Sequence, residues 1–286
     1  MRKIKLKAKA VSDLMKTELL FAAGICVIAG EILALGRCPS FFDAFLGFFT
    51  VFFISGSAMI SNDYFDLNVD KINRPSRPLP SGRITILELK MLMGTFSIAG
   101  LTIAALIGPV QLIFAAGLWM AGVLYNWRLK ETGIPGNLIV SLSVATTFIF
   151  GGVAVGEAFS RVVWTFGALA FIFDFGEEIA GGAMDIEGDK QRQVKSLASH
   201  RGKKVALRIS AALFSMFIGI SVFPYIMNWL GISYLFLVVP TDSVLAYFAF
   251  KLLQSDTIKE GQARIRHLYL TSVLFVIGFI ISRVIS

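Results

Sequence analysis

Residues 62–83 read Asn62-Asp-Tyr-Phe-Asp66-Leu-Asn-Val-Asp70-Lys-Ile-Asn-Arg74-Pro-Ser-Arg77-Pro-Leu-Pro-Ser-Gly82-Arg83, and they follow a long apolar run. If the helix of that run continues through this stretch, Asp63, Asp66 and Asp70 fall at positions i, i+3 and i+7 and share one helical face. Carboxylates that gather in this way repel one another unless cations lie beside them. The stretch therefore predicts a cation-dependent site at the end of a helix.

The composition is that of a membrane protein. Of the 286 residues, 56% are hydrophobic and only 16% are charged, and the apolar residues come in blocks of about 20, the length that spans a bilayer as a helix. The links between these blocks are too short to form a separate folded unit. We therefore expect one integral membrane domain over residues 1–286, in which residues 1–16 form a basic cytoplasmic arm.

The predicted fold is all-α, with nine transmembrane helices around a central cavity. Each apolar block is close to the length that a bilayer requires. The expected spans are residues 17–36, 41–62, 86–107, 110–127, 137–156, 162–183, 205–228, 231–253 and 267–285.

The basic residues lie in short links between the apolar blocks, and their distribution predicts the orientation in the membrane. With the N-terminus in the cytoplasm, only Arg37, Arg161 and Arg283 of the 27 Lys and Arg residues fall outside. This predicts a cytoplasmic working face and an external C-terminus. It also explains the net charge of +8 without nucleic acid, and we expect no nucleic-acid partner and infer no obligatory protein partner. Cys26 and Cys38 have no metal-ligand spacing and are expected to be inert thiols.

A second acidic cluster follows the sixth expected span and reads Asp185-Ile186-Glu187-Gly188-Asp189. Asp185 and Asp189 stand at positions i and i+4, again on one helical face. The two clusters lie about 122 residues apart, follow even-numbered spans and point the same way. This predicts two four-helix repeats plus a ninth helix, with the clusters facing each other across the cavity.

Two facing carboxylate clusters would repel unless cations bridge them, and Mg²⁺ is the abundant cation that prefers oxygen ligands. Mg²⁺ usually binds one or two carboxylates together with substrate phosphates, so a phosphate-bearing substrate is expected. Basic side chains near the clusters would neutralise its oxygens. These candidates are Lys71, Arg74, Arg77, Arg128, Lys130, Lys190, Arg192 and Lys195, whereas Arg83, Arg201, Lys203 and Lys204 are better explained by membrane topology.

Phosphate chemistry at the end of an apolar bundle indicates a substrate with a lipid tail, and an isoprenyl diphosphate fits. Loss of its diphosphate leaves an allylic carbocation that needs a dry wall of aromatic faces. Tyr64, Phe65 and Tyr125 are the aromatic residues nearest the polar stretches. Two alternatives remain open, an ion-coupled membrane transporter and a lipid-binding scaffold without catalysis.

Acidic residues within the expected spans are further functional candidates. Glu177 and Glu178 lie two turns before Asp185 and are candidates for the cavity wall. Asp242 is expected to pair across helices, and Glu31 to lie near the outer interface. No general base is evident, so the proton released in a transfer reaction would go to the diphosphate or to water.

The motif residues resemble the signatures of the UbiA-type intramembrane prenyltransferases. The stretch from Asn62 to Asp70, running into Asn73-Arg-Pro-Ser-Arg77-Pro-Leu-Pro-Ser-Gly82, looks like the first signature. The Asp185-x-x-x-Asp189 stretch with Lys195-Ser-Leu-Ala198 resembles the second, and Tyr125 to Lys130 resembles the segment after the fourth span. The resemblance extends over most of the chain and implies a nine-helix bundle, Mg²⁺ dependence and transfer of a prenyl group from its diphosphate to a small acceptor.

The resemblance also implies roles for individual residues. Asp66, Asp70, Asp185 and Asp189, with Asn62, would hold the metal and diphosphate. Arg74, Lys130 and Lys195 would contact the diphosphate, and Tyr125 would lie by the reacting carbon, whereas Asp63 belongs to the motif without a clear role.

Within the family, the first signature is most similar to that of the archaeal-type digeranylgeranylglyceryl phosphate synthases, which implies geranylgeranylglyceryl phosphate as the acceptor. Aromatic acceptors such as 4-hydroxybenzoate, or other quinone, haem or chlorophyll precursors, are the alternative. The chain departs from many members, because Glu177-Glu178-Ile179 and Gly181-Gly182 stand where those have Arg-Glu-Ile and Lys-Asp.

Overall fold

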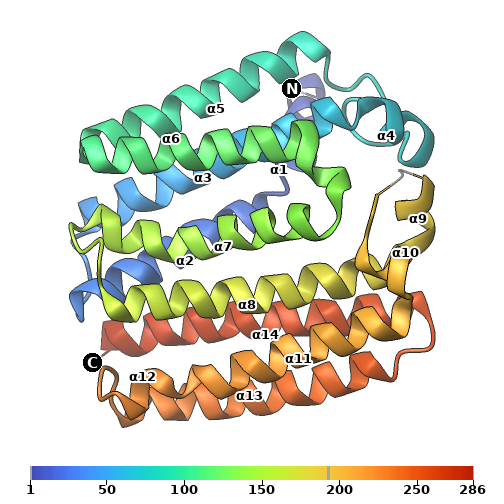
Figure 1. The fold of residues 1–286 in the computed structure, drawn as a ribbon. Helices are drawn as coiled ribbons and strands as arrows, with labels where there is room; N and C mark the ends of the chain where they lie inside the picture. Colours follow the sequence, from blue (N-terminus) through green and yellow to red (C-terminus); the bar gives the residue numbers. More distant parts are fainter. Residues whose placement is uncertain (1, 192–193, 286) are drawn as a thin grey trace.

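The computed structural model describes residues 2–191 and 194–285, which form long helices packed side by side (Figure 1). The first half of the chain contains α1 (Arg2–Met15), α2 (Thr17–Leu35), α3 (Phe41–Phe65), α4 (Leu67–Asn73), α5 (Ile86–Ile107), α6 (Pro109–Leu124), a π-helix η1 (Tyr125–Leu129), a 3₁₀ turn η2 (Lys130–Thr132) and α7 (Ile134–Ala154). The second half contains α8 (Arg161–Met184), α9 (Ile186–Gln191), α10 (Leu197–Arg201), α11 (Lys203–Ser221), α12 (Phe223–Ile226), α13 (Ile232–Leu253) and α14 (Ile258–Ile285).

The all-helical membrane architecture predicted from the sequence is confirmed. Within the described chain, eight helical segments are long and apolar enough to cross a membrane, and they correspond to every expected span except the sixth. The sixth corresponds to α8, which has 24 residues but carries Asp174, Glu177 and Glu178. The chain is therefore a multi-pass membrane protein, while the count of nine spans stays a prediction.

Several helix ends differ from the predicted spans, because charged residues end an apolar block without ending a helix. α14 begins at Ile258, although the predicted span began at residue 267, and its additional turns carry Lys259, Glu260, Arg264 and Arg266. The seventh span is interrupted, because α11 ends at Ser221 and Pro224 lies in the first turn of the separate helix α12. The predicted helix through the first acidic stretch also breaks, since Asp66 separates α3 from α4.

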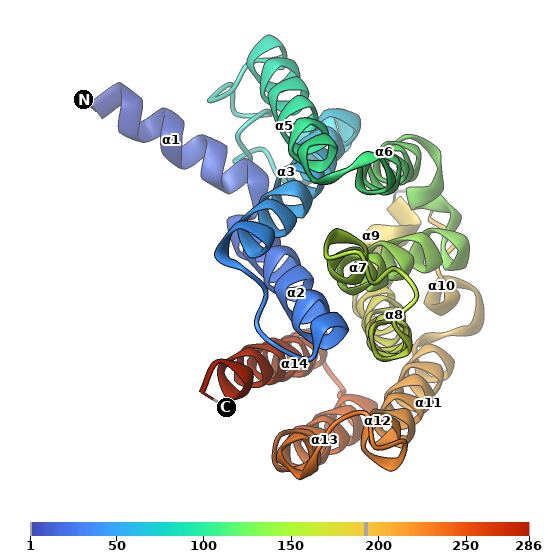
Figure 2. The same ribbon diagram turned by 90° about the vertical axis from the view of Figure 1, so that its left-hand side faces the viewer.

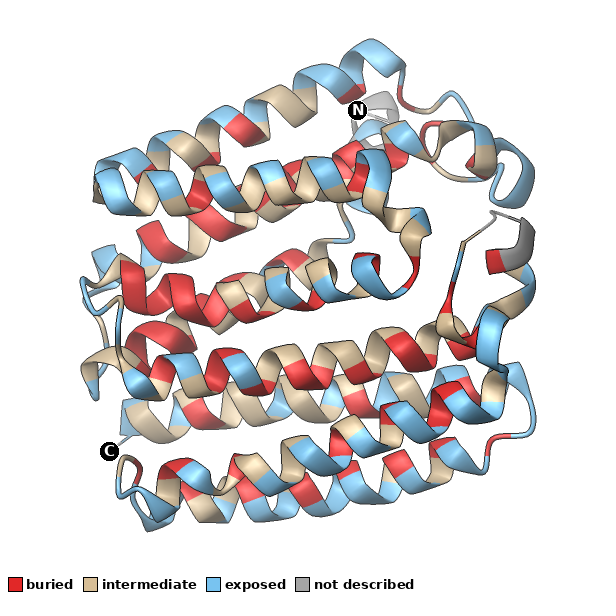
Figure 3. Cartoon of the chain, viewed as in Figure 1, coloured by how far each residue is buried: buried red, intermediate tan, exposed pale blue. Residues whose placement is uncertain are grey.

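Seen along their length, the helices surround a central cavity, as the sequence predicted (Figure 2). Its lining comes from α2, α3, α6, η1, α7, α8, α11, α13 and α14, together with Lys16, and its volume is about 770 Å³. α5 lies outside this ring against α3. Much of the outer surface of the helices is exposed (Figure 3). The exposed apolar side chains include Leu106, Ile113, Phe236 and Leu274. An apolar outer surface of this kind suits contact with lipid tails.

Close contact between α2 and α7 fixes one side of the cavity. At Gly30 and Gly151 the two backbones touch, so that a side chain added at Gly151 would lie 2.8 Å from the backbone nitrogen of Glu31. Small residues commonly permit such contacts between membrane helices. The glycines therefore bring the two cavity-lining helices together.

The basic arm predicted at the N-terminus is helical. α1 extends sideways from the bundle (Figure 2), and its last turns pack against the end of the bundle where Ala10 and Leu14 are buried beside Leu79 and Ile84. α4, α9 and α10 lie at this same end, opposite the C-terminus (Figure 1). Both acidic clusters are thus at one end of the bundle, as predicted, while the side of the membrane that this end faces stays a prediction.

Candidate active site

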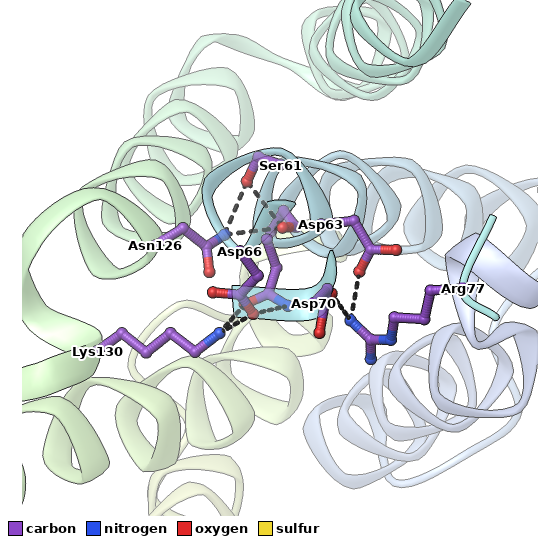
Figure 4. Close-up of polar contacts among 9 residues, drawn as sticks. Ser61, Asp63, Asp66, Asp70, Arg77, Asn126 and Lys130 are labelled. Carbon is purple, nitrogen blue, oxygen red and sulfur yellow. Dashed lines mark hydrogen bonds and ion pairs between the residues drawn. The ribbon is translucent and has the colours of Figure 1, made fainter. Parts of the chain in front are cut away.

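Arg77 pairs with two carboxylates of the first acidic stretch (Figure 4). Its Nη1 donates to Asp63 Oδ1 at 3.0 Å and to Asp70 Oδ2 at 2.8 Å. Asp63 and Asp70 are 4% and 5% exposed, so both carboxylates are withdrawn from water. Buried carboxylates need a cation nearby, and the guanidinium of Arg77 supplies it. Arg77 thus joins Asp63 of α3 to Asp70 of α4. The single helical face predicted for Asp63, Asp66 and Asp70 is wrong, because the helix breaks at Asp66.

Asp66 pairs with a different cation, Lys130, because the break between α3 and α4 turns its side chain toward η1 and η2. Lys130 Nζ pairs with Asp66 and also donates to Asn62 Oδ1 at 2.7 Å. Asn62 Nδ2 donates to Asp66 Oδ2 at 3.2 Å (Figure 4). The structure thus brings together Asn62, Asp66 and Lys130, all predicted as site residues.

The π-helix η1 determines where Lys130 lies. π-Helical turns are rare and occur often at functional sites. This one is attached to α3 by Asn126, whose Nδ2 donates to the Ala58 carbonyl at 2.8 Å and to Ser61 Oγ at 2.7 Å (Figure 4). Asn126 was not predicted from the sequence. Its contacts hold η1 against the end of α3 and so place Lys130 next to Asp66.

Local hydrogen bonds order the loop that carries Arg77. The Arg77 amide donates to the Arg74 carbonyl at 3.0 Å, and Ser81 Oγ donates to the Arg77 carbonyl at 2.6 Å. Leu79 and Ile84 are buried under α1 and anchor the loop to the bundle. Arg77 is therefore presented from a structured turn.

The second acidic cluster lies where α8 passes into α9. Asp185 is exposed and follows α8, whereas Asp189 is 8% exposed, and its amide donates to the Asp185 carbonyl at 2.8 Å. Beyond this cluster, the Lys195 amide donates to the Glu131 carbonyl at 3.2 Å, which attaches the segment to η2. The backbone around Lys195 thus meets the turn that carries Lys130. Of the other predicted basic residues, Arg192 lies outside the described residues, as does the side chain of Lys190.

No three acidic, His or Cys side chains of the described chain converge closely enough to form a metal site by themselves. The first cluster instead encloses a polar pocket of about 220 Å³. Its walls contain Lys16, Asn62, Asp66, Asp70, Asn73, Arg74, Arg77, Tyr125 and Lys130. Oxygen donors and cationic groups therefore share one small space, a combination that suits a phosphate group bound with a divalent cation.

The polar pocket adjoins the large cavity, because Lys16, Asn62 and Tyr125 line both. Most of the large cavity is apolar, with Phe148, Phe166 and Phe173 among its walls. An amphipathic ligand with an anionic head and an apolar tail would match this pair of spaces. Lys71 and Arg128 are exposed and line neither space, and the Arg128 guanidinium lies 4.9 Å from the ring centre of Trp127.

Lys16 is the cation that sequence reasoning missed. It lies between α1 and α2 with a φ of 45°, an uncommon conformation for a residue with a side chain. Lys16 is exposed at the rim of the two spaces, and partial desolvation there, followed by the positive charge of Arg77, lowers its pKa below the ordinary value. In the sequence, a lysine before the first span is explained by membrane topology. Its position beside the polar pocket depends on the turn between α1 and α2, which the sequence pattern does not predict.

Two further buried acids lie away from the polar pocket. Asp242 accepts a hydrogen bond from Ser221 Oγ at 2.6 Å, which confirms the predicted pairing across helices. Glu31 is fully buried near Gly47 and has no hydrogen-bond partner among the described residues. Neither acid lines the polar pocket.

The sequence profile of the UbiA prenyltransferase family matches residues 23–276. A protein named digeranylgeranylglyceryl phosphate synthase from Thermococcus kodakarensis is 31% identical, over 97% of this chain and 99% of its own length. The protein of that name from Methanocaldococcus jannaschii is 32% identical over 97% of both chains.

Solved structures of similar proteins share the fold of this chain. A structure described as digeranylgeranylglyceryl phosphate synthase in membranes has a TM-score of 0.78 and 29% identity, over 98% of this chain and 99% of that chain. A UbiA homologue from Archaeoglobus fulgidus, bound to GPP and Mg²⁺, shares the fold with a TM-score of 0.78 at 18% identity, over 96% of this chain and 99% of that chain.

The Arg77 pairs yield a stability prediction. Arg77→Met leaves the buried Asp63 and Asp70 carboxylates without their cation, and removing one partner of a buried pair costs about 3–5 kcal/mol. We expect a clear fall in the thermal midpoint in detergent, partly restored when Asp63→Asn is added. Arg83→Met is the matched control, because Arg83 and its partner Asp13 are 37% and 39% exposed, and such pairs contribute about 0–1 kcal/mol. Equal midpoints for the two arginine variants would contradict the assignment.

Lys16 yields a binding prediction. Lys16→Met removes a cation from the wall shared by both spaces, and a hydrogen bond to a charged group contributes about 1.5–3 kcal/mol. We expect the Kd for inorganic diphosphate with Mg²⁺, measured by titration calorimetry, to rise by roughly tenfold or more. Lys9→Met is the control, because Lys9 is exposed on α1. If both variants bind diphosphate like the unaltered protein, Lys16 is not part of the anion site.

Proposed function

This chain belongs to the UbiA prenyltransferase family, and from that membership we propose that it transfers a geranylgeranyl group from its diphosphate to the free hydroxyl of geranylgeranylglyceryl phosphate. The product would carry the second ether bond of an archaeal-type membrane lipid. The observation that carries the proposal is the polar pocket of cations and carboxylates that adjoins an apolar cavity of about 770 Å³. The relatives named digeranylgeranylglyceryl phosphate synthase support this choice of substrates.

The polar pocket would hold the diphosphate. Arg74, Lys130 and Lys16 line it and would neutralise the phosphate oxygens. Lys195 is exposed and lines neither space, and it would have to turn toward the diphosphate to contact it. Asn62, Asp66 and Asp70 supply oxygen atoms of the kind that Mg²⁺ prefers, and Asp185 and Asp189 would complete the set from the other motif. Bound there, Mg²⁺ would stabilise the negative charge of the departing diphosphate.

Lys130 pairs with Asp66, and Arg77 pairs with Asp70. We assign both of these carboxylates to the metal-diphosphate site. A phosphate group would attract these cations away from Asp66 and Asp70, and so free the carboxylate oxygens for the metal. Positive and negative charges would then remain paired before and after binding. This exchange satisfies the requirement that buried charges keep partners.

The transfer breaks the allylic C–O bond, and the electron pair leaves with the diphosphate. The acceptor oxygen then forms a bond to the first carbon of the prenyl group and loses its proton. The apolar walls of the large cavity would hold the prenyl chain and exclude water from the carbocation. Tyr125 lines this cavity and would lie beside the reacting carbon. On this proposal the polar end of the bundle faces the cytoplasm, in agreement with the basic links.

The cavity wall favours a neutral hydroxyl over an aromatic acceptor with a carboxylate. Asp174, Glu177 and Glu178 line the large cavity, and this acidic part of the wall supplies no cation to pair with the carboxylate of 4-hydroxybenzoate. A glycerol hydroxyl has no such charge, and the phosphate of the lipid acceptor would stay with the basic residues at the polar end. A transporter is disfavoured, because the chain belongs to a prenyltransferase family.

The proposal is tested by incubating purified protein with geranylgeranyl diphosphate, Mg²⁺ and either geranylgeranylglyceryl phosphate or 4-hydroxybenzoate, with products identified by mass. We expect the lipid ether to form, to disappear with EDTA and to return when Mg²⁺ is restored. Asp66→Ala and Asp189→Ala should reduce turnover to near background, whereas Glu187→Ala, altered on the exposed surface of α9, should not. Prenylation of 4-hydroxybenzoate alone would replace the proposed acceptor.

A further inference from the structure

Three acidic side chains project from one face of α8 into the large cavity, and the reaction described above uses none of them for chemistry. Asp174, Glu177 and Glu178 stand at positions i, i+3 and i+4 of the helix and line the cavity. Carboxylates are costly inside a membrane protein and usually mark a functional pathway or site. Their different surroundings show which of them can reach a reacting substrate.

Asp174 and Glu177 have neighbours on other walls of the cavity. Asp174 accepts a hydrogen bond from Ser141 Oγ on α7 at 2.8 Å. Glu177 lies within electrostatic range of Tyr269 on α14, together with Glu18 on α2. Asp174 is therefore already engaged by α7, and Glu177 lies toward α14.

Glu178 faces the polar pocket through Tyr125. Glu178 and Tyr125 both line the large cavity, and the Tyr125 hydroxyl lies within electrostatic range of Glu178, Asp66 and Asp174. Tyr125 lines both the polar pocket and the large cavity. Glu178 is thus the α8 acid directed toward the place where the two spaces meet.

The depth of Glu178 matches that of the reacting carbon. It precedes Asp185 by seven residues, which is roughly 10 Å along a helix that rises about 1.5 Å per residue. A diphosphate held between the acidic clusters would direct its prenyl carbon inward from that end. Glu178 therefore lies on the inner side of the leaving group, where an acceptor oxygen must approach.

Glu178 is also accessible to a ligand. Its carboxyl group makes no hydrogen bond or ion pair with any other residue in the part of the chain that the structure describes, and its side chain is half-buried against the cavity. One turn further along α8, a side chain added at Gly181 would meet no atom within 4 Å. Open space therefore lies beside the carboxyl group.

We propose that Glu178 is the general base of the transfer reaction and accepts the proton of the acceptor hydroxyl. This inference rests on the proposed function. As the oxygen of the acceptor bonds to the prenyl carbon, its O–H bond breaks and the proton passes to a carboxylate oxygen of Glu178. The diphosphate leaves with the electron pair of the broken C–O bond. The protonated carboxyl group then returns its proton to water or to the departing diphosphate, so atoms and charge balance.

The test compares Glu178→Gln with Glu177→Gln, which makes the same change at the neighbouring position toward α14. Two rates are measured with geranylgeranyl diphosphate and Mg²⁺: ether formation with geranylgeranylglyceryl phosphate, and release of diphosphate without acceptor. General base catalysis typically contributes about 10²–10⁴-fold. We expect Glu178→Gln to lower kcat for ether formation by roughly 100-fold, to leave KM for the prenyl diphosphate unchanged and to preserve diphosphate release. Glu177→Gln changes the same cavity wall without removing the proposed base, so it should lower kcat for ether formation far less than Glu178→Gln does.

Each result of this comparison is decisive. If Glu178→Gln forms ether as fast as Glu177→Gln, Glu178 is not the base, and the proposed function stands. If Glu178→Gln slows diphosphate release and ether formation equally, the residue acts on the leaving group, and the inference is wrong. If the unaltered protein releases diphosphate but forms no ether with the lipid acceptor, the proposed function and the inference fail together.

Discussion

The bridge that Arg77 Nη1 makes between two carboxylates is the interaction on which the polar end of the bundle depends. One guanidinium group holds Asp63, near the end of α3, and Asp70, within α4. It thereby fixes the bend between the two helices that turns Asp66 toward Lys130. Without these pairs, two nearly buried carboxylates would face each other across the bend. Because buried ion pairs gain little net stability over apolar packing, their retention here is better explained by a binding role.

The same charge balance connects the architecture with the proposed chemistry. Cations and carboxylates that neutralise each other in the free protein can each exchange that partner for one half of a magnesium diphosphate. The apolar cavity beside them would then take the prenyl chain, and α8 lines that cavity with acids, of which Glu178 is the one we propose as the base. Such a site would hold the leaving diphosphate, the reacting carbon and the apolar tail at successive depths along one axis.

Much of this organisation could be predicted from the sequence, because apolar blocks and acidic motifs are local patterns. The helical spans, the cavity and the pairing of Asp242 across helices followed from such patterns. Positions that depend on irregular backbone could not be predicted. Lys16 reaches the site through a left-handed turn between α1 and α2, and Asn126 does so through a π-helix. The sequence also did not show that Lys71 and Arg128 are exposed. A residue can lie next to a motif in the sequence and still point from another face of the helix.

The central claim is that a metal-bound diphosphate joins the two acidic motifs. It is tested most directly by an experimental structure with Mn²⁺ in place of Mg²⁺ and a non-hydrolysable geranylgeranyl thiodiphosphate, using the anomalous signal of Mn²⁺ to locate the metal. The account predicts metal peaks next to Asp66 and Asp70 and next to Asp185 and Asp189, with the diphosphate between them and Lys130 moved onto a phosphate oxygen. A bound diphosphate whose metal contacts only one motif, or neither, would contradict it.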